Sequence, residues 1–178
     1  MIDNPIIPAR TALERVRGLA GFYVRRKILG RDLPLLASFK LTYRCNLHCA
    51  PCPYHRRSDA AGSSMGWGTA TAALDALYRA GCRIVVFEGG EPLLWRDGAR
   101  SFADLALYAR ERFLCTAATT NGTLTLDVPV DVLWVSLDGT RETHNRLRSG
   151  SFDRVWENLR KPPRGKLLVH YTMNRENW

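Results

Sequence analysis

Residues 45–52 read CNLHCAPC and place three cysteines, Cys45, Cys49 and Cys52, at the spacing C-x3-C-x2-C. The stretch directly before them, LLASFKLTY (residues 35–43), has the apolar pattern of a β-strand, so the cysteines follow the carboxyl end of a predicted strand. Three thiolates in one loop suit a zinc ion or an iron–sulfur cluster. No fourth cysteine follows nearby, so a metal group held here lacks one protein ligand.

Beyond this loop, apolar strand patterns alternate with helical patterns. Further strands are predicted over residues 82–90, 113–122, 131–139 and 166–174. Helices are predicted over residues 72–81, 102–113 and 152–159. Gly81 is the stop signal of the first of these helices, and Ser149 or Ser151 is the candidate N-cap of the last.

The alternation indicates a parallel α/β fold. Five strands separated by crossover segments indicate βαβ units, and right-handed crossovers bring the strand carboxyl ends to one edge. Only eight residues, 123–130, join the third and fourth strands, so we expect a turn of helix or an irregular loop there.

Polar and glycine-rich residues follow the ends of four consecutive strands. They are the cysteine loop, Gly89-Gly90-Glu91-Pro92, Thr120-Asn121-Gly122 and Ser136-Leu137-Asp138-Gly139. Parallel α/β folds place their active sites at the carboxyl ends of the strands. The sequence therefore predicts one active site to which all four segments contribute.

Length and composition indicate an ordinary globular chain of 178 residues, with 46% hydrophobic and 24% charged residues. No apolar run approaches the ~20 residues of a membrane span, and the N-terminus lacks the apolar core of a secretory signal. Five cysteines, three of them within eight residues, argue against a disulfide framework and for a reducing compartment. We therefore expect a cytoplasmic protein.

The net charge of +9 is concentrated at the N-terminus. Residues 1–31 carry seven Arg or Lys residues against Asp3 and Glu14, which is +5 of the total. Their apolar residues fall on one side of a helix, so we separate a basic amphipathic extension, residues 1–33, from a core, residues 34–178. Such a helix suits an anionic membrane surface, to which the protein would be peripheral, or a polyanion. The alternative that we favour is a leader helix packed on the domain with its basic face in solvent.

Two kinds of metal site fit the cysteine loop. In one, His48 or His55 is the fourth ligand of a closed Cys3His zinc site, and the basic chain is a zinc-stabilised nucleic-acid-binding module. In the other, three irons of a [4Fe–4S] cluster are bound by thiolates and the fourth iron stays open. An open coordination position is what makes a metal site catalytic.

The order and spacing of the four segments resemble the radical S-adenosylmethionine (SAM) superfamily from about Leu35 to Asn177. The resemblance implies a partial (βα)6 barrel of the TIM type in which SAM chelates the open iron. It also implies an enzyme that takes an electron from an external donor and reductively cleaves SAM. The resulting 5′-deoxyadenosyl radical would take a hydrogen atom from a substrate that the sequence does not identify.

The same resemblance assigns roles to particular residues. Cys45, Cys49 and Cys52 would bind the cluster. The SAM contacts would come from Gly89, Gly90, Glu91, Asn121, Ser136, Asp138 and Arg148. Glu91 would meet the methionine ammonium, and Arg148 resembles an arginine placed near the SAM carboxylate, a task suited to bidentate guanidinium geometry.

This sequence departs from the family pattern in two places. Pro51 stands before the third cysteine, where many members have an aromatic residue near the adenine, and Tyr54 is a candidate substitute. The predicted barrel also ends after its fifth strand, so we expect a missing segment or a partner to cover that strand. A truncated, non-catalytic relative is therefore a second alternative. His170, on the last strand, is a candidate to face the barrel interior.

Overall fold

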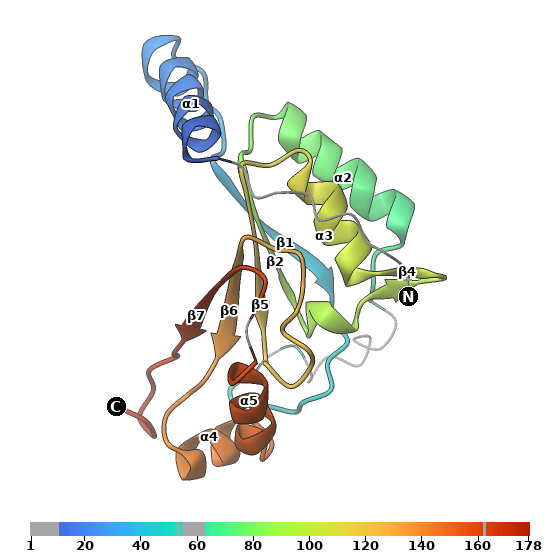
Figure 1. Ribbon diagram of the computed structural model, residues 1–178, viewed down its shortest axis with the longest axis vertical. Helices are drawn as coiled ribbons and strands as arrows, with labels where there is room; N and C mark the ends of the chain where they lie inside the picture. Colours follow the sequence, from blue (N-terminus) through green and yellow to red (C-terminus); the bar gives the residue numbers. More distant parts are fainter. Residues whose placement is uncertain (1–10, 53, 55–62, 162) are drawn as a thin grey trace.

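The fold is built on a five-stranded parallel sheet with the strand order β1-β2-β5-β6-β7 (Figure 1). This computed structural model describes residues 11–52, 54, 63–161 and 163–178. The strands are β1 (Leu36–Thr42), β2 (Ile84–Gly89), β5 (Cys115–Thr120), β6 (Val132–Ser136) and β7 (Lys166–His170). Each neighbouring pair is parallel, so all five strands end at the same edge of the sheet. The five predicted strands and their parallel arrangement are confirmed.

Helices and short elements connect the strands. The longer ones are α1 (Ala12–Tyr23), which continues as the π-helix η1 (Val24–Ile28), then α2 (Trp67–Arg79), α3 (Phe102–Arg110), α4 (Arg141–Leu147) and α5 (Phe152–Leu159). Between β2 and α3 lie the 3-10 helix η2 (Pro92–Leu94) and a small antiparallel hairpin, β3 (Arg96–Asp97) with β4 (Arg100–Ser101).

The main core lies between the sheet and the helices α2 and α3, which run side by side on one face (Figure 1). Alternate residues of the strands, among them Phe39 and Leu41 of β1 and Phe87 of β2, point into this core and are buried. Leu74 of α2 and Leu105 of α3 meet them. Each fully buried side chain of this size contributes roughly 1.5–3 kcal/mol to folding. The intervening residues of β1 and β2 point to the other face of the sheet.

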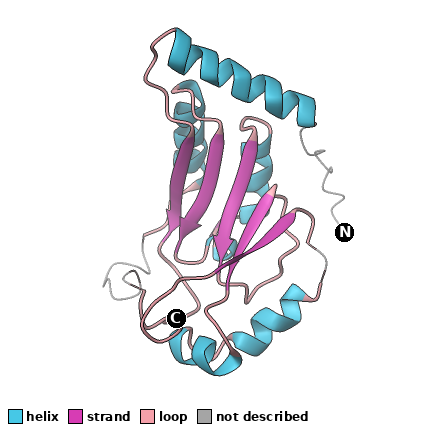
Figure 2. Cartoon of the chain, turned by 90° about the vertical axis from the view of Figure 1, so that its left-hand side faces the viewer, coloured by secondary structure: helices cyan, strands magenta, loops and turns pink. Residues whose placement is uncertain are grey.

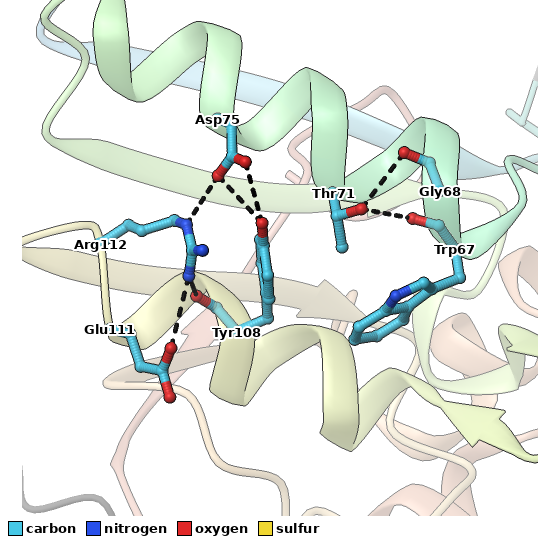
Figure 3. A network of polar contacts seen from close by, with 7 residues as sticks. All are labelled: Trp67, Gly68, Thr71, Asp75, Tyr108, Glu111 and Arg112. Carbon is cyan, nitrogen blue, oxygen red and sulfur yellow. Dashed lines mark hydrogen bonds and ion pairs between the residues drawn. The ribbon is translucent and has the colours of Figure 1, made fainter.

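A polar network holds α2 against α3 on the outside of this core (Figure 3). The carboxylate of Asp75 accepts hydrogen bonds from the Tyr108 hydroxyl at 3.0 Å and from Nε of Arg112 at 2.6 Å. The Arg112 guanidinium also lies 3.6 Å from the centre of the Tyr108 ring. These contacts lower the pKa of Asp75, chiefly through the Arg112 hydrogen bond. They join α2 to α3, and neither helix contributes a lining residue to the cavity described below.

At the carboxyl edge of the sheet, α4 and α5 meet through a buried histidine. Nδ1 of His144 accepts the backbone N–H of Asp138 at 3.2 Å, so Nε2 carries the proton and lies 3.0 Å from the Ser151 hydroxyl. The Ser151 hydroxyl donates in turn to the carbonyl oxygen of Arg148 at 2.7 Å. Ser151 precedes α5 as predicted, but its side chain serves this network and does not cap the helix.

Several sequence predictions can be compared directly with the structure. Gly81 does end the segment after α2, with φ of +99°. The connection over residues 123–130 is irregular, and it buries Leu126, Val128 and Val130. Helix α4 and the β3–β4 hairpin were not predicted. Within the described residues, none of the helices combines the length and the apolar character that crossing a bilayer requires.

Helix α1 differs from its expectation. It lies across the amino-terminal edge of the sheet (Figure 2), and it is held there by Arg15, whose Nη2 lies 3.2 Å from Oδ1 of Asp131, and by Gly18, which packs on Leu114. No residue of α1 is buried. The favoured prediction was a helix packed on the domain with its basic face in solvent. The helix does rest on the domain, but through the side with Arg15 and Gly18, so its apolar residues are exposed as well.

Candidate active site

A cavity of about 350 Å³ opens at the carboxyl ends of the strands. This volume is within the usual range of ligand pockets, about 300–1,000 Å³. Of the predicted site residues, eight line it: Cys45, Cys49, Cys52, Gly89, Gly90, Asn121, Ser136 and Arg148. Arg148 follows α4, and the other seven come from all four segments that follow strands, so the predicted convergence of these segments is found in the fold. Glu91 and Asp138 are buried behind the cavity wall.

The cysteine loop is tied to the end of α4. The backbone N–H of Ala50 donates to the carbonyl oxygen of Leu147 at 3.0 Å, and the N–H of His48 donates to the Ser149 hydroxyl at 2.9 Å. Ser149 adopts a positive φ of 54°, unusual for a residue with a side chain, where the chain turns after α4. The loop therefore depends on a helix almost a hundred residues away in sequence.

The three thiols differ in their surroundings. Cys49 is buried, whereas Cys45 and Cys52 are half-buried. Burial raises the pKa of the Cys45 and Cys49 thiols, and the nearby Arg148 charge opposes this shift at Cys49. Thiolates are the metal-binding form, so binding of a metal group here must release protons.

Asn121 connects the end of β5 to the cysteine loop. Its Nδ2 donates to Oδ1 of Asn46 at 2.8 Å and lies 3.7 Å from Sγ of Cys45. Its Oδ1 accepts the backbone N–H and the hydroxyl of Thr123, at 3.0 and 2.7 Å. Asn121 lines the cavity, but its side chain is already occupied in positioning the loop; a direct contact with SAM stays a prediction.

The two glycines at the end of β2, Gly89 and Gly90, permit a close contact between backbones. A Cβ atom on Gly90 would lie 2.3 Å from the carbonyl oxygen of Arg44, and one on Gly89 would lie 2.1 Å from that of Thr42. The N–H of Gly90 donates to the same Thr42 oxygen at 2.7 Å. Glycine is therefore required here to seat the end of β2 against the chain that leads into Cys45.

Glu91 is fully buried, and its carboxylate is surrounded by donors of the chain itself. It accepts the Thr120 hydroxyl at 2.9 Å and the backbone N–H groups of Asn121 and Leu93 at 2.7 and 3.1 Å. Burial outweighs these bonds and raises its pKa to about 7. The structure thus shows Glu91 bracing the ends of β2 and β5, and its contact with the SAM ammonium stays a prediction.

Asp138 and Arg148 form a buried ion pair. Nε of Arg148 donates to Oδ2 of Asp138, whose other oxygen accepts the backbone N–H of Thr172 at 2.8 Å. The Asp138 side chain is 1% exposed and that of Arg148 is 15% exposed. Asp138 therefore aims Arg148 into the cavity from behind. Ser136, at the end of β6, is buried and lines the cavity directly.

The cavity also contains charged residues that were not predicted as site residues. Nζ of Lys40 lies 2.5 Å from Oε2 of Glu88, across the register pair of β1 and β2. Desolvation lowers the pKa of Lys40, but the hydrogen bond and charge of Glu88 outweigh it and leave that pKa raised. The strand alternation in SFKL (residues 38–41) and VFEG (86–89) was the available signal, because it turns Lys40 and Glu88 away from the core.

Two aromatic residues named from the sequence also lie at the cavity. Tyr54 lines it and packs against Tyr43, with ring centres 5.4 Å apart. His170, at the end of β7, lines it too and meets Trp134 edge to face at 5.8 Å. His170, a candidate to face the barrel interior, therefore lies on the cavity side of the sheet.

The donor set fits a cluster better than a single metal ion. Tetrahedral zinc holds sulfur ligands about 3.8 Å apart, given Zn–S bonds of ~2.3 Å, whereas a [4Fe–4S] cluster binds each thiolate at a different iron. In the described part of the chain, no three His, Cys, Asp or Glu side chains gather closely enough for one metal ion. His48 is exposed, and His55 lies outside the described residues.

Comparison with known proteins gives a consistent result. The family model of the radical SAM superfamily matches residues 39–162. The chain is 30% identical over 159 residues to Fe-coproporphyrin III synthase of Methanosarcina barkeri. This match covers 83% of this chain and 39% of that protein. It is 32% identical over 141 residues to the antilisterial bacteriocin subtilosin biosynthesis protein AlbA of Bacillus subtilis, covering 72% of this chain and 30% of that one.

The fold is also similar to solved structures. Streptococcus suis SuiB bound to S-adenosylmethionine matches with a TM-score of 0.61 and 19% identity, covering 82% of this chain and 35% of SuiB. At this identity the likeness concerns the fold. The chain spans less than two fifths of the length of both curated relatives named above. None of these matches supports the zinc-stabilised nucleic-acid module.

Proposed function

This chain belongs to the radical SAM superfamily, a family of enzymes that use a [4Fe–4S] cluster and SAM, and we propose that its cavity is the cofactor site of such an enzyme. In this proposal Cys45, Cys49 and Cys52 bind the cluster, and SAM lies between the cluster and the ends of β2, β5 and β6. The observation that carries the proposal is the convergence of the three thiols with Arg148 on one cavity.

When bound, the cluster and SAM would supply the difficult chemistry, namely the reductive cleavage of SAM and the removal of a hydrogen atom from a substrate. The electron would come from an external donor. The task of the chain is to bind and orient these groups. Asn121 and the end of α4 hold the cysteine loop in place, as described above.

Arg148 is suited to the SAM carboxylate. Its Nε is used by Asp138, which leaves the two terminal nitrogens for a bidentate contact inside the cavity. The hydroxyl of Ser136 supplies a neutral donor and acceptor at the end of β6 for the ribose or the methionine end of SAM.

Tyr54 provides the aromatic surface that Pro51 cannot provide beside the cysteines. Its ring lines the cavity and is steadied by Tyr43. We propose that it packs near the adenine. The Gly89–Gly90 segment then supplies backbone groups at the methionine end, with Glu91 behind it as the counter-charge of the ammonium.

The proposal is limited to the reaction class that the relatives share. Their names refer to Fe-coproporphyrin III and to the bacteriocin subtilosin, which are different kinds of molecule. The substrate of this chain is therefore not assigned from them. The Lys40–Glu88 pair and His170 also line the cavity and have no proposed contact with the cluster or SAM. We propose that the substrate enters beside them.

The test is an activity assay of the whole chain. The protein is reconstituted anaerobically with iron and sulfide, reduced chemically with SAM present, and assayed for 5′-deoxyadenosine by liquid chromatography. We expect 5′-deoxyadenosine in the wild type and none in Cys49→Ala. A stable cluster without any 5′-deoxyadenosine would instead identify the chain as a non-catalytic relative.

A further inference from the structure

Helix α1 presents its apolar side to solvent. The outer face of α1, defined here as Leu13, Val16, Leu19 and Tyr23 together with Val24 at the start of η1, has helical spacing, and all five side chains are exposed. Leu13, Val16 and Tyr23 are 57%, 63% and 61% exposed. Single exposed apolar residues are ordinary on proteins, but a continuous stripe along one helix marks an interaction surface.

Tertiary contacts on the other side of the helix fix this orientation. A Cβ atom on Gly18 would lie 2.4 Å from Cδ1 of Leu114, so the backbone of α1 rests directly on that side chain. Arg15 reaches Asp131, which is itself held by the backbone N–H of Thr116 at 2.8 Å. A rotation of α1 that hides its outer face would break both contacts.

Basic residues surround the outer face. Arg17, Arg25, Lys27 and Arg31 are exposed, and within the part of the chain that the structure describes their side chains make no ion pair or hydrogen bond with another side chain. Further apolar side chains, Ile28 and Leu29 of the following turn, are exposed beside them. The surface thus combines an apolar stripe with unpaired positive charge.

We propose that α1 docks this protein on the surface of an anionic lipid bilayer. An amphipathic helix with an apolar side and flanking Lys or Arg residues lies in the plane of the bilayer, with the apolar side buried about 5–10 Å. Tyr23 is suited to the interface, because its ring is apolar and its hydroxyl is polar. Long basic side chains reach from the same depth to the lipid phosphates.

Other occupants fit the surface less well. A second copy of the chain would bring two basic helices together, and like charges across an interface oppose association. A nucleic acid would use the basic residues for its phosphates but has no need of an aliphatic stripe. A bilayer with anionic lipids satisfies both parts of the surface.

The docked orientation leaves the cavity accessible. Helix α1 lies at the amino-terminal edge of the strands and the cavity at the carboxyl edge, so the two are at opposite ends of the sheet (Figure 2). A bilayer held by α1 would therefore not cover the cavity. The inference is independent of the cofactor assignments, and its failure would leave them untouched.

Vesicle co-sedimentation of the whole chain tests the proposal. We expect binding to vesicles of phosphatidylcholine with phosphatidylglycerol and little binding to phosphatidylcholine alone. Val16→Glu with Tyr23→Glu should abolish the binding while leaving the circular dichroism spectrum and melting temperature unchanged, since both side chains are exposed. The matched control is Met173→Glu with Trp178→Glu, two exposed apolar residues beyond β7, which should bind as the wild type does.

A charge series gives the second arm of the test. Arg17→Gln, Arg25→Gln and Lys27→Gln should each lower partition onto anionic vesicles by about fivefold, and added salt should do the same. Equal binding by all variants, or no binding by the wild type, overturns the proposal. A wild-type dimer that Val16→Glu with Tyr23→Glu dissociates, or RNA binding without vesicle binding, also overturns it.

Discussion

The carboxylate of Glu91 accepts the backbone N–H of Asn121 at 2.7 Å, and the side chain of Asn121 lies 3.7 Å from the sulfur of Cys45. A buried acid after β2 is thereby linked through β5 to a thiol after β1. None of the three residues is close to another in sequence. The relationship joins the three segments that follow β1, β2 and β5, and it makes several variants informative.

The cysteines are the first test. Cys45→Ala, Cys49→Ala and Cys52→Ala should each prevent formation of a [4Fe–4S] cluster, because each removes one of three thiolates that line the cavity. Iron and sulfide content and the visible absorption spectrum measure this. Cys115→Ala is the control: it removes a half-buried thiol of β5 outside the cavity and should reconstitute as the wild type does. A normal cluster in Cys49→Ala would contradict the assignment.

Gly90→Ala should damage the site without touching a ligand. Its Cβ would lie 2.3 Å from the carbonyl oxygen of Arg44, and because the clash is with backbone, β2 and the cysteine loop must separate. We expect a loss of about 1–3 kcal/mol in the free energy of unfolding, measured in urea, and a lower iron content.

Gly68→Ala is the matched control for that variant. Gly68 lies in α2, and nothing stands within 4 Å of its Cβ position. Alanine there should raise stability by about 0.4–1 kcal/mol and leave the iron content unchanged. Equal changes in stability and iron content for the two substitutions would show that the close contact between Gly90 and Arg44 does not hold the site together.

Glu91 predicts a pH dependence of stability. Burial raises its pKa to about 7 from the ordinary 4.5, so the folded state binds this proton more tightly than the unfolded state. The resulting stabilisation is complete below pH 4.5 and is lost as the pH rises through 7, by at most about 3 kcal/mol. Glu91→Gln removes the titration.

The measurement is the difference in free energy of unfolding between wild type and Glu91→Gln across this range. Wild type should lose stability relative to the variant between pH 5 and 8. A difference that stays constant with pH would mean that Glu91 is ionised throughout, as its three donors favour.

Substitutions at Arg148 and Asp138 are expected to have non-additive effects on the free energy of unfolding. Arg148→Ala leaves the buried Asp138 charge without its cation and should cost about 3–5 kcal/mol. Adding Asp138→Asn should recover part of that loss, because the uncompensated charge is removed. SAM affinity, measured by calorimetry on the reconstituted protein, should be lost in both variants, since both lack the guanidinium.

Arg164→Ala is the control for this pair. Arg164 pairs with Asp127 on the surface, where both side chains are about half exposed, and such pairs contribute about 0–1 kcal/mol. Tight SAM binding by the Arg148→Ala/Asp138→Asn protein would contradict the proposed contact between Arg148 and SAM.

Much of the fold follows from local sequence patterns. Strand alternation and helical spacing place β1, β2, β5, β6, β7 and α5 within a few residues of their observed bounds. The convergence of Cys45, Asn121 and Ser136 was also predictable, because parallel strands must end at one edge. Motif residues at successive strand ends are therefore brought together by topology alone.

Other features depend on contacts that no local pattern contains. Helical spacing shows which side chains of α1 share a side, but only Gly18 on Leu114 and Arg15 on Asp131 decide which side faces the domain. In the same way, the resemblance assigned Asp138 a contact with SAM, which stays a prediction, but it gave no sign that this carboxylate is buried and paired with Arg148. Such roles depend on depth below the surface, which a motif does not record.

The central claim is that the three-cysteine loop leaves one iron open for SAM. The most direct measurement is the electron paramagnetic resonance spectrum of the reconstituted, reduced chain with and without SAM. The account predicts a [4Fe–4S] signal that changes when SAM is added, because SAM binds the cluster itself. Stoichiometric zinc in place of iron, or a cluster signal that SAM leaves unchanged, would contradict it.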